Sequence, residues 1–155
     1  MIGPGSSRGA LGGYTAATLL DAPKHSPLVL RLSAHGSSAV LTKAPGESVQ
    51  HLVLKGLLWA LLVPTCPDAA CEVDLGMRYK PDVVSIEGTG RPRWWGECGS
   101  VRASKLQQLA TTFPHCRFTV AKWGRSDLRG YASQLVRRAC STCAARALSP
   151  LACAV

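Results

Sequence analysis

The sequence predicts one α/β or α+β domain in which a mixed β-sheet is flanked by helices. The first observation is the order of the patterns along the chain, which runs strands, helix, strands, helix, strand, helix. The second is that 155 residues, 46% of them hydrophobic, suffice for one compact domain with a sizeable core. The third is that no apolar run approaches the ~18 residues that suggest a membrane span. We therefore expect a cytoplasmic protein without a membrane partner.

Three parts are expected along the chain. Residues 1–26 are rich in small residues, and their apolar run is too weak for a signal peptide, so they are predicted to be a flexible leader. Residues 27–140 contain the patterned segments and are predicted to form the folded domain. Residues 141–155 carry little pattern and are predicted to be a tail.

The first patterned segments are two short strands. "LVLRLS" (28–33) and "SAVLT" (38–42) are rich in β-prone residues and are separated by the turn-like "AHGS". This spacing predicts a β-hairpin.

The next segment, "ESVQHLVLKGLLWALL" (47–62), predicts a helix that ends before Pro64 and Pro67. Apolar residues at spacings of three and four predict the face that packs on the core. These residues are Val49, Leu52, Val53, Leu57 and Ala60.

A polar stripe is expected along one side of this helix. Glu47, His51 and Lys55 are spaced four residues apart, so they fall on one face. Glu47 is placed in the first turn, where a negative charge suits the helix dipole. His51 is interpreted as a residue of the helix surface rather than a general base.

Three strands are expected next. "CEVDLGM" (71–77) is a candidate strand, and "KPDVVSI" (80–86) is a better one, with Pro81 at its first position. "RWWGEC" (93–98) follows after the short turn "EGTGRP". Because the turn is short, the strands at 80–86 and 93–98 are predicted to pair antiparallel.

The remaining segments predict helix, strand and helix. Residues 101–113 are predicted to form a second helix, with Ser100 as its candidate N-cap. "RFTVAKW" (117–123) is the strand. The last helix is predicted over residues 126–139, with Ser126 as its N-cap.

Two carboxylates are expected to meet on the paired strands. Alternation places Asp82 on one face of its strand and Glu97 on the face shared by Trp95 and Arg93. Two carboxylates close together repel each other, and a divalent cation removes the conflict. Mg²⁺ is typically held by one or two carboxylates together with substrate phosphates. The alternative is that Asp82 is an ordinary acid at a strand edge and that Glu97 pairs with Arg93 on the surface.

The positive charge of the chain is concentrated in its second half. The net charge is +9, and residues 78–138 carry twelve Lys or Arg against four Asp or Glu, a net charge of +8. Such an excess favours a polyanionic partner, here the backbone of a nucleic acid. The alternative is a basic protein without such a partner.

The motifs around the two acids resemble those of the PD-(D/E)XK nuclease superfamily. "KPDVVSI" contains the Pro81-Asp82 pair, and "WGECG" contains Glu97 in the Glu-x-Gly form of the second motif. The acidic residue that opens the first helix, Glu47, is similar to that of the YaeQ-like branch. The resemblance covers roughly residues 28–123, within the expected domain 27–140, and it implies a restriction-endonuclease-like fold.

This resemblance implies a metal-dependent nuclease that hydrolyses phosphodiester bonds in DNA or RNA. Asp82, Glu97 and the backbone carbonyl of Cys98 would bind Mg²⁺ or Mn²⁺, with Glu47 assisting. A non-catalytic nucleic-acid-binding domain on the same fold is the alternative, because a fold does not guarantee its chemistry.

One departure from the superfamily concerns its catalytic lysine. Position 99, two residues after Glu97, is Gly. Lys105 is the nearest lysine downstream and is predicted to take over the role, with Arg102 as a second candidate. The basic residues predicted to hold the nucleic-acid backbone are Arg102, Lys122, Arg125 and Arg129.

The tryptophans and cysteines receive simpler interpretations. Trp94 and Trp95 are both predicted to belong to the core. The chain has seven cysteines, an odd count that favours reduced thiols over a disulfide framework. Cys140 and Cys143 have half the spacing of a zinc site, for which Cys66 and Cys71 are the only second pair.

Overall fold

The computed structural model describes residues 27–124 and 128–140. The predicted leader 1–26, the predicted tail 141–155, and Arg125 and Ser126 therefore lie outside the described residues. The elements are β1 (Val29–Ala34), β2 (Ser37–Thr42), α2 (Val49–Leu62), β3 (Ala70–Cys71), β4 (Val83–Ile86), β5 (Pro92–Cys98), α3 (Ala103–Thr112), β6 (Arg117–Ala121) and α4 (Leu128–Cys140).

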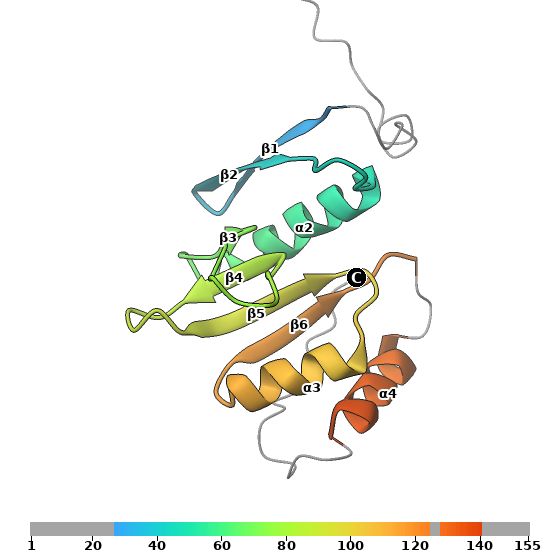
Figure 1. Ribbon diagram of the computed structural model, residues 1–155. Coiled ribbons are helices and arrows are strands. Elements are labelled where there is room, and N and C mark those ends of the chain that lie inside the picture. Colours follow the sequence, from blue (N-terminus) through green and yellow to red (C-terminus); the bar gives the residue numbers. More distant parts are fainter. Residues whose placement is uncertain (1–26, 125–127, 141–155) are drawn as a thin grey trace, which may run out of the picture.

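The described residues form two sheets. The main sheet has four strands in the order β3-β4-β5-β6, with β3, β4 and β5 antiparallel and β6 parallel to β5. The β1–β2 hairpin is a separate sheet of two strands. Figure 1 shows α2 between the hairpin and the main sheet, with α3 and α4 on the other side of that sheet. The predicted mixed sheet flanked by helices is confirmed.

Both sides of α2 are covered, so the predicted buried face is only partly right: Val49 and Leu52 are buried as predicted. Leu54 and Leu58 are buried against the main sheet, whereas Leu57, assigned to the buried face, is 45% exposed. Gly56 lies against the hairpin, since an added Cβ would come within 2.5 Å of the Leu32 side chain. A helix packed between two layers buries more than the single stripe that periodicity predicts.

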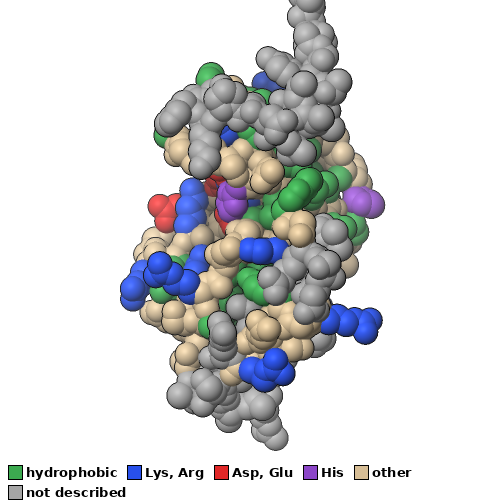
Figure 2. Space-filling view, turned by 90° about the vertical axis from the view of Figure 1, so that its right-hand side faces the viewer, with side chains coloured by type: hydrophobic (Ala, Val, Ile, Leu, Met, Phe, Trp, Pro, Cys, Tyr) green, Lys and Arg blue, Asp and Glu red, His purple; other side chains and the backbone are tan. Residues whose placement is uncertain are grey.

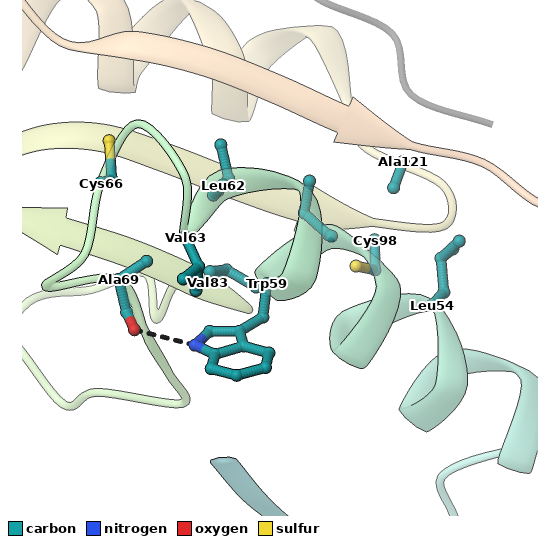
Figure 3. Close-up of a cluster of buried hydrophobic side chains, with 10 residues drawn as sticks. Leu54, Trp59, Leu62, Val63, Cys66, Ala69, Val83, Cys98 and Ala121 are labelled. Atoms are coloured by element: carbon teal, nitrogen blue, oxygen red, sulfur yellow. Dashed lines mark hydrogen bonds between the residues drawn. The ribbon is translucent and has the colours of Figure 1, made fainter. Parts of the chain in front are cut away.

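The main core cluster lies between α2 and the sheet (Figure 3). Trp59 is 2% exposed, and its indole N–H donates to the Ala69 carbonyl oxygen at 2.9 Å. Gly96 in β5 brings this helix close to the sheet, because an added Cβ would come within 2.7 Å of Leu58 Cδ2. Trp94 and Trp95 also pack in the core, as predicted: Trp95 is fully buried and Trp94 is half-buried.

The predicted strand at 71–77 is wrong beyond its first residue. Only Ala70–Cys71 pair with β4, and Glu72 has a φ of +56°. A non-glycine residue with positive φ turns the chain out of the extended conformation. The amide of Glu72 then donates to the Asp82 carbonyl oxygen at 3.1 Å, which fixes Glu72 beside the start of β4.

The predicted position of Arg93 on the same face as Glu97 is also wrong. Ser85 pairs with Trp94, whereas Ile86 pairs with Pro92, so Arg93 is an extra residue at a bulge. Its guanidinium contacts Asp68 at 2.7 Å and Ser85 at 3.0 Å. The alternative in which Glu97 pairs with Arg93 on the surface therefore does not hold.

Two helix starts differ from the prediction. Ser48 is the N-cap of α2 and accepts a hydrogen bond from the His51 amide at 3.2 Å, so Glu47 precedes the helix instead of lying in its first turn. Arg102, not Ser100, is the N-cap residue of α3, and it makes no capping side-chain hydrogen bond. Ser100 instead accepts a hydrogen bond from Lys122 Nζ at 2.6 Å.

Four cysteines of the described residues have free, reduced thiols: Cys66, Cys71, Cys98 and Cys116. The prediction of reduced thiols is confirmed for these four. The proposed zinc half-site cannot be placed, because Cys143 lies outside the described residues. None of the helices described is long and apolar enough to span a membrane. Cytoplasmic location stays a prediction.

Candidate functional site

The candidate site lies where the ends of β5 and β6 approach the starts of α2 and α3, on the right of Figure 1. Asp82 directly precedes β4, and its amide donates to the Gly96 carbonyl oxygen at 3.1 Å. Continuing the Val83–Gly96 register by one residue places Asp82 opposite Glu97. The two acids predicted from alternation and a short turn therefore lie at the same end of the sheet.

Glu97 is a buried carboxylate with two hydrogen-bond donors. Its side chain is 8% exposed. Trp95 Nε1 donates to Oε1 at 2.6 Å, and Lys105 Nζ donates to Oε2 at 2.6 Å. Burial raises the pKa of Glu97, the contacts with Lys105 and Trp95 oppose this, and the negative charge of Asp82 adds to the rise. Lys105 thus reaches Glu97 from α3, as the sequence predicts.

Asp82 is held by a backbone amide and a histidine. The Cys98 amide donates to Asp82 Oδ2 at 2.7 Å, and His51 Nε2 lies 3.2 Å from Oδ1. The hydrogen bond to Asp82 raises the pKa of His51, although burial acts in the opposite direction. His51, interpreted as a residue of the helix surface, is therefore part of the site. Its place on the stripe with Glu47 is the signal that could have indicated this.

A buried lysine joins two further acids next to this pair. Lys55 is 3% exposed, its Nζ lies 2.5 Å from Glu47 Oε1, and it also donates to Glu72 Oε1. Burial alone would lower the pKa of Lys55, but its hydrogen bonds with Glu47 and Glu72 outweigh burial and raise it. Glu47 therefore belongs to the site region: besides Lys55 it contacts His51 Nε2 at 3.7 Å, and His51 in turn contacts Asp82. The sequence indicated neither the role of Lys55 nor that of Glu72.

Two hollows border the residues of the site. One is lined by Glu97, Lys105, Arg102 and Tyr79, among others, and its volume is about 400 Å³. A smaller one is lined by residues that include His51 and Lys122. Figure 2 looks onto this end of the molecule and shows a histidine beside acidic side chains, with Lys and Arg side chains around them.

The basic residues predicted to hold a nucleic acid are only partly placed by the structure. Arg102 and Lys122 line the two hollows. Arg129 is exposed on α4. Arg125 lies outside the described residues. The structure thus brings Arg102 and Lys122 next to the acids, whereas Arg129 has no described contact with the site.

The donor groups fit a hard divalent cation. Mg²⁺ and Mn²⁺ prefer carboxylate oxygens, and Mg²⁺ usually keeps several water ligands. No three His, Cys, Asp or Glu side chains form a ready metal cage in the parts of the chain that the structure describes. Asp82 and Glu97 would therefore share the cation with water, phosphate oxygens and the Cys98 carbonyl. To free one Glu97 oxygen for the cation, the Lys105 side chain would have to move toward solvent. Lys105 is 21% exposed, which leaves room for this movement.

The contact between His51 and Asp82 predicts a pH-dependent contribution to stability. Because the folded-state pKa of His51 is raised above its ordinary value of about 6.5, the contact stabilises the fold fully below about pH 6.5. This contribution is lost as the pH rises through the raised pKa. The measurement is the free energy of unfolding of the wild type minus that of His51→Gln across this range. The pH dependence of this difference should become much weaker in an Asp82→Asn background, where only the weaker effect of Glu47 remains; an unchanged slope there would contradict the assignment.

The fold is similar to that of a solved protein. The YaeQ protein from Xanthomonas axonopodis pv. citri superposes with a TM-score of 0.52 at 20% sequence identity, covering 73% of this chain and 70% of that one. At this identity the likeness concerns the fold alone. No protein-family model and no curated protein matches the sequence.

Proposed function

We propose that this protein is a Mg²⁺- or Mn²⁺-dependent phosphodiesterase of the PD-(D/E)XK, YaeQ-like type that cleaves nucleic acid. The observation that carries the proposal is the meeting of Asp82 and Glu97 at one end of the sheet, with Lys105 bound to Glu97. The fold shared with the YaeQ protein is consistent with it. The motifs at Pro81-Asp82 and Glu97 add to this support.

The roles follow from the contacts of each residue. Asp82, Glu97 and the Cys98 carbonyl would hold the cation, which when bound lowers the pKa of a water ligand and polarises the phosphodiester. Lys105 is placed to stabilise negative charge on the phosphate next to Glu97. Glu47 is positioned through Lys55 and would assist from the side of α2.

Nucleic acid is the proposed substrate because of the basic residues around the acids. Arg102 and Lys122 line the hollows next to the site, and residues 78–138 carry a net charge of +8. Such residues contact phosphates, which positions a backbone without reading its sequence.

This electrostatic binding predicts a steep dependence on salt. If about six phosphates are contacted, the affinity should fall on the order of a thousandfold between ~50 and ~200 mM salt, because bound counterions are released. Fluorescence anisotropy with a labelled strand in the presence of chelator measures this. An affinity that does not change with salt would exclude binding driven by the backbone.

The proposal is tested by incubating the protein with plasmid, single-stranded DNA and RNA, each with Mg²⁺, Mn²⁺ or chelator. Cleavage should require the cation and should disappear in Asp82→Asn, while nucleic-acid binding survives in that variant. Calorimetry with Mn²⁺ should show a site that Asp82→Ala and Glu97→Ala each remove. Cleavage that persists in folded Asp82→Asn protein would refute the assignment.

A second candidate is a nucleic-acid-binding domain without turnover. Each acid of the site is already paired with a cationic or titratable side chain: Glu97 with Lys105, Asp82 with His51, and Glu47 with Lys55. Gly99 also replaces the superfamily's usual lysine. Salt-dependent binding without cation-dependent cleavage would favour this candidate.

A further inference from the structure

A small pocket next to the carboxylates has no role in the proposed cleavage beyond the phosphate contact assigned to Lys122. Its volume is about 150 Å³. His51, Leu54, Gly99, Lys122 and Trp123 are among the residues that line it. His51 also contacts Asp82 through Nε2 at 3.2 Å. The pocket and the carboxylate site therefore share one side chain.

Trp123 stands out in this pocket because its indole is exposed to water. Its exposed fraction is 45%, whereas those of Trp59 and Trp95 are 2% and 0%. Large aromatic side chains usually bury most of their surface. An exposed indole at the wall of a pocket offers a flat surface on which a planar ring can stack.

The size of the pocket suits one aromatic ring. A protein cavity of about 150 Å³ is known to hold a single benzene-sized ring. Gly99, at a φ of +82°, contributes no side chain to this space, and an added Cβ would come within 3.7 Å of His51 Nδ1. A glycine at this position keeps the pocket open beside the histidine.

The charge at the rim favours a ring that carries phosphate. Lys122 is held there by a hydrogen bond from its Nζ to Ser100 Oγ at 2.6 Å and by the ring of Tyr131, 5.7 Å away. An ammonium group next to a stacking surface is the combination that binds single-stranded nucleic acids, in which bases stack and phosphates meet cations.

We propose that this pocket binds one unstacked nucleobase of a single-stranded nucleic acid, with the base stacked on Trp123. The proposal rests on the proposed function in taking nucleic acid as the ligand, and it narrows the substrate to single strands. A base within a duplex is stacked and paired, and it enters such a pocket only after it has been flipped out at a cost in free energy.

The test measures binding without cleavage, using the full chain in chelator. Three probes of the same length, about 12 nucleotides, fall within the usual site sizes: an oligothymidylate, an abasic deoxyribose-phosphate strand and a duplex. The abasic strand has the same charge and no bases. Trp123→Ala should weaken oligothymidylate binding by roughly 5- to 150-fold, as the loss of one stacked aromatic side chain does, and should leave abasic binding unchanged.

Two further variants make the result specific. Stacking of a base on Trp123 should quench tryptophan fluorescence when the wild type binds oligothymidylate. Trp123→Phe should retain part of the preference for oligothymidylate over the abasic strand and lose most of this quenching. Leu61→Ala removes an apolar side chain that is 57% exposed near the other end of α2. Leu61→Ala should change neither the affinity for oligothymidylate nor the affinity for the abasic strand.

The proposal is overturned if Trp123→Ala weakens both single strands equally or neither of them, or if the duplex binds as tightly with the same dependence on Trp123. Absence of binding to all three probes overturns it as well. If Trp123→Ala still cleaves nucleic acid and binds oligothymidylate with unchanged affinity, the pocket proposal is refuted and the proposed function stands. If the wild type binds oligothymidylate through Trp123 but cleaves no nucleic acid with Mg²⁺ or Mn²⁺, the proposed activity is refuted and the nucleobase pocket stands.

Discussion

Under the proposed function, replacing Lys105 by alanine is expected to lower the rate of phosphodiester cleavage by roughly 10²–10³, the loss that follows removal of one charge-stabilising donor. Lys105 Nζ lies 2.6 Å from Glu97 Oε2 and is only 21% exposed. No other lysine contacts Glu97 among the described residues. Single-turnover cleavage in Mg²⁺ and in Mn²⁺ measures the effect, because binding is then separated from chemistry.

The structure adds a second effect of this substitution. Lys105 lowers the pKa of Glu97 against the rise caused by burial, so its removal should raise that pKa further. If Lys105 acts mainly by keeping Glu97 ionised, cleavage by Lys105→Ala should recover as the pH increases. If Lys105 stabilises charge on the phosphate, the loss should persist at every pH.

A matched control exists for the loss of charge. Lys80→Ala removes one positive charge from the same basic region at an exposed position, and it should leave the single-turnover rate nearly unchanged. Unaltered cleavage in Lys105→Ala would move the role to Arg102 or leave the site without a catalytic cation. Restoring a lysine at position 99 is not a clean rescue, because the φ of Gly99 is +82°, where side chains are strained.

Replacing Lys55 by alanine is expected to cause the largest loss of stability, about 3–5 kcal/mol in the free energy of unfolding. Lys55 is 3% exposed and sits between Glu47 and Glu72. Its removal leaves Glu47, whose side chain is 8% exposed, as a buried charge without its partner. Urea unfolding measures the change.

A combined variant distinguishes lost pairing from lost packing. Lys55→Met with Glu47→Gln and Glu72→Gln removes all three charges together and should recover most of the stability, since replacing a whole buried ion cluster is often nearly neutral. Lys80→Ala serves again as the control and should stay within about 0.5 kcal/mol of the wild type. A loss in Lys55→Ala no larger than that of the control would contradict the assigned role.

The part of the site that could be predicted is the part fixed by local rules. Alternation and a short turn were enough to place Asp82 opposite Glu97, because both strands belong to one hairpin. The reach of Lys105 followed from its position early in the next helix. Each of these inferences joins residues that are close in sequence.

The rest depends on contacts that no local pattern encodes. The contact between Lys55 and Glu72 requires the chain to turn at a residue with positive φ and return beside β4. The buried face of α2 depends on a second layer, the β1–β2 hairpin, packing on the helix. The alternation rule failed at Arg93, where one extra residue in the strand reverses the face.

Gly96 has a consequence for the site that its neighbours do not share. The groups of the site come in two halves: His51 and Lys55 are carried by α2, and Glu97 is carried by the sheet. Leu58 of α2 occupies the space where a Cβ at position 96 would lie, at 2.7 Å. The absent side chain therefore sets the spacing between the two halves. Alanine at this position would force Leu58 to shift, because its Cβ would lie 2.7 Å from Leu58 Cδ2 and 3.3 Å from Val83. To the extent that α2 moves with Leu58, the distance between His51 and Asp82 would increase while every charged residue stayed in the sequence. A residue of the apolar core thus controls the geometry of the charged site.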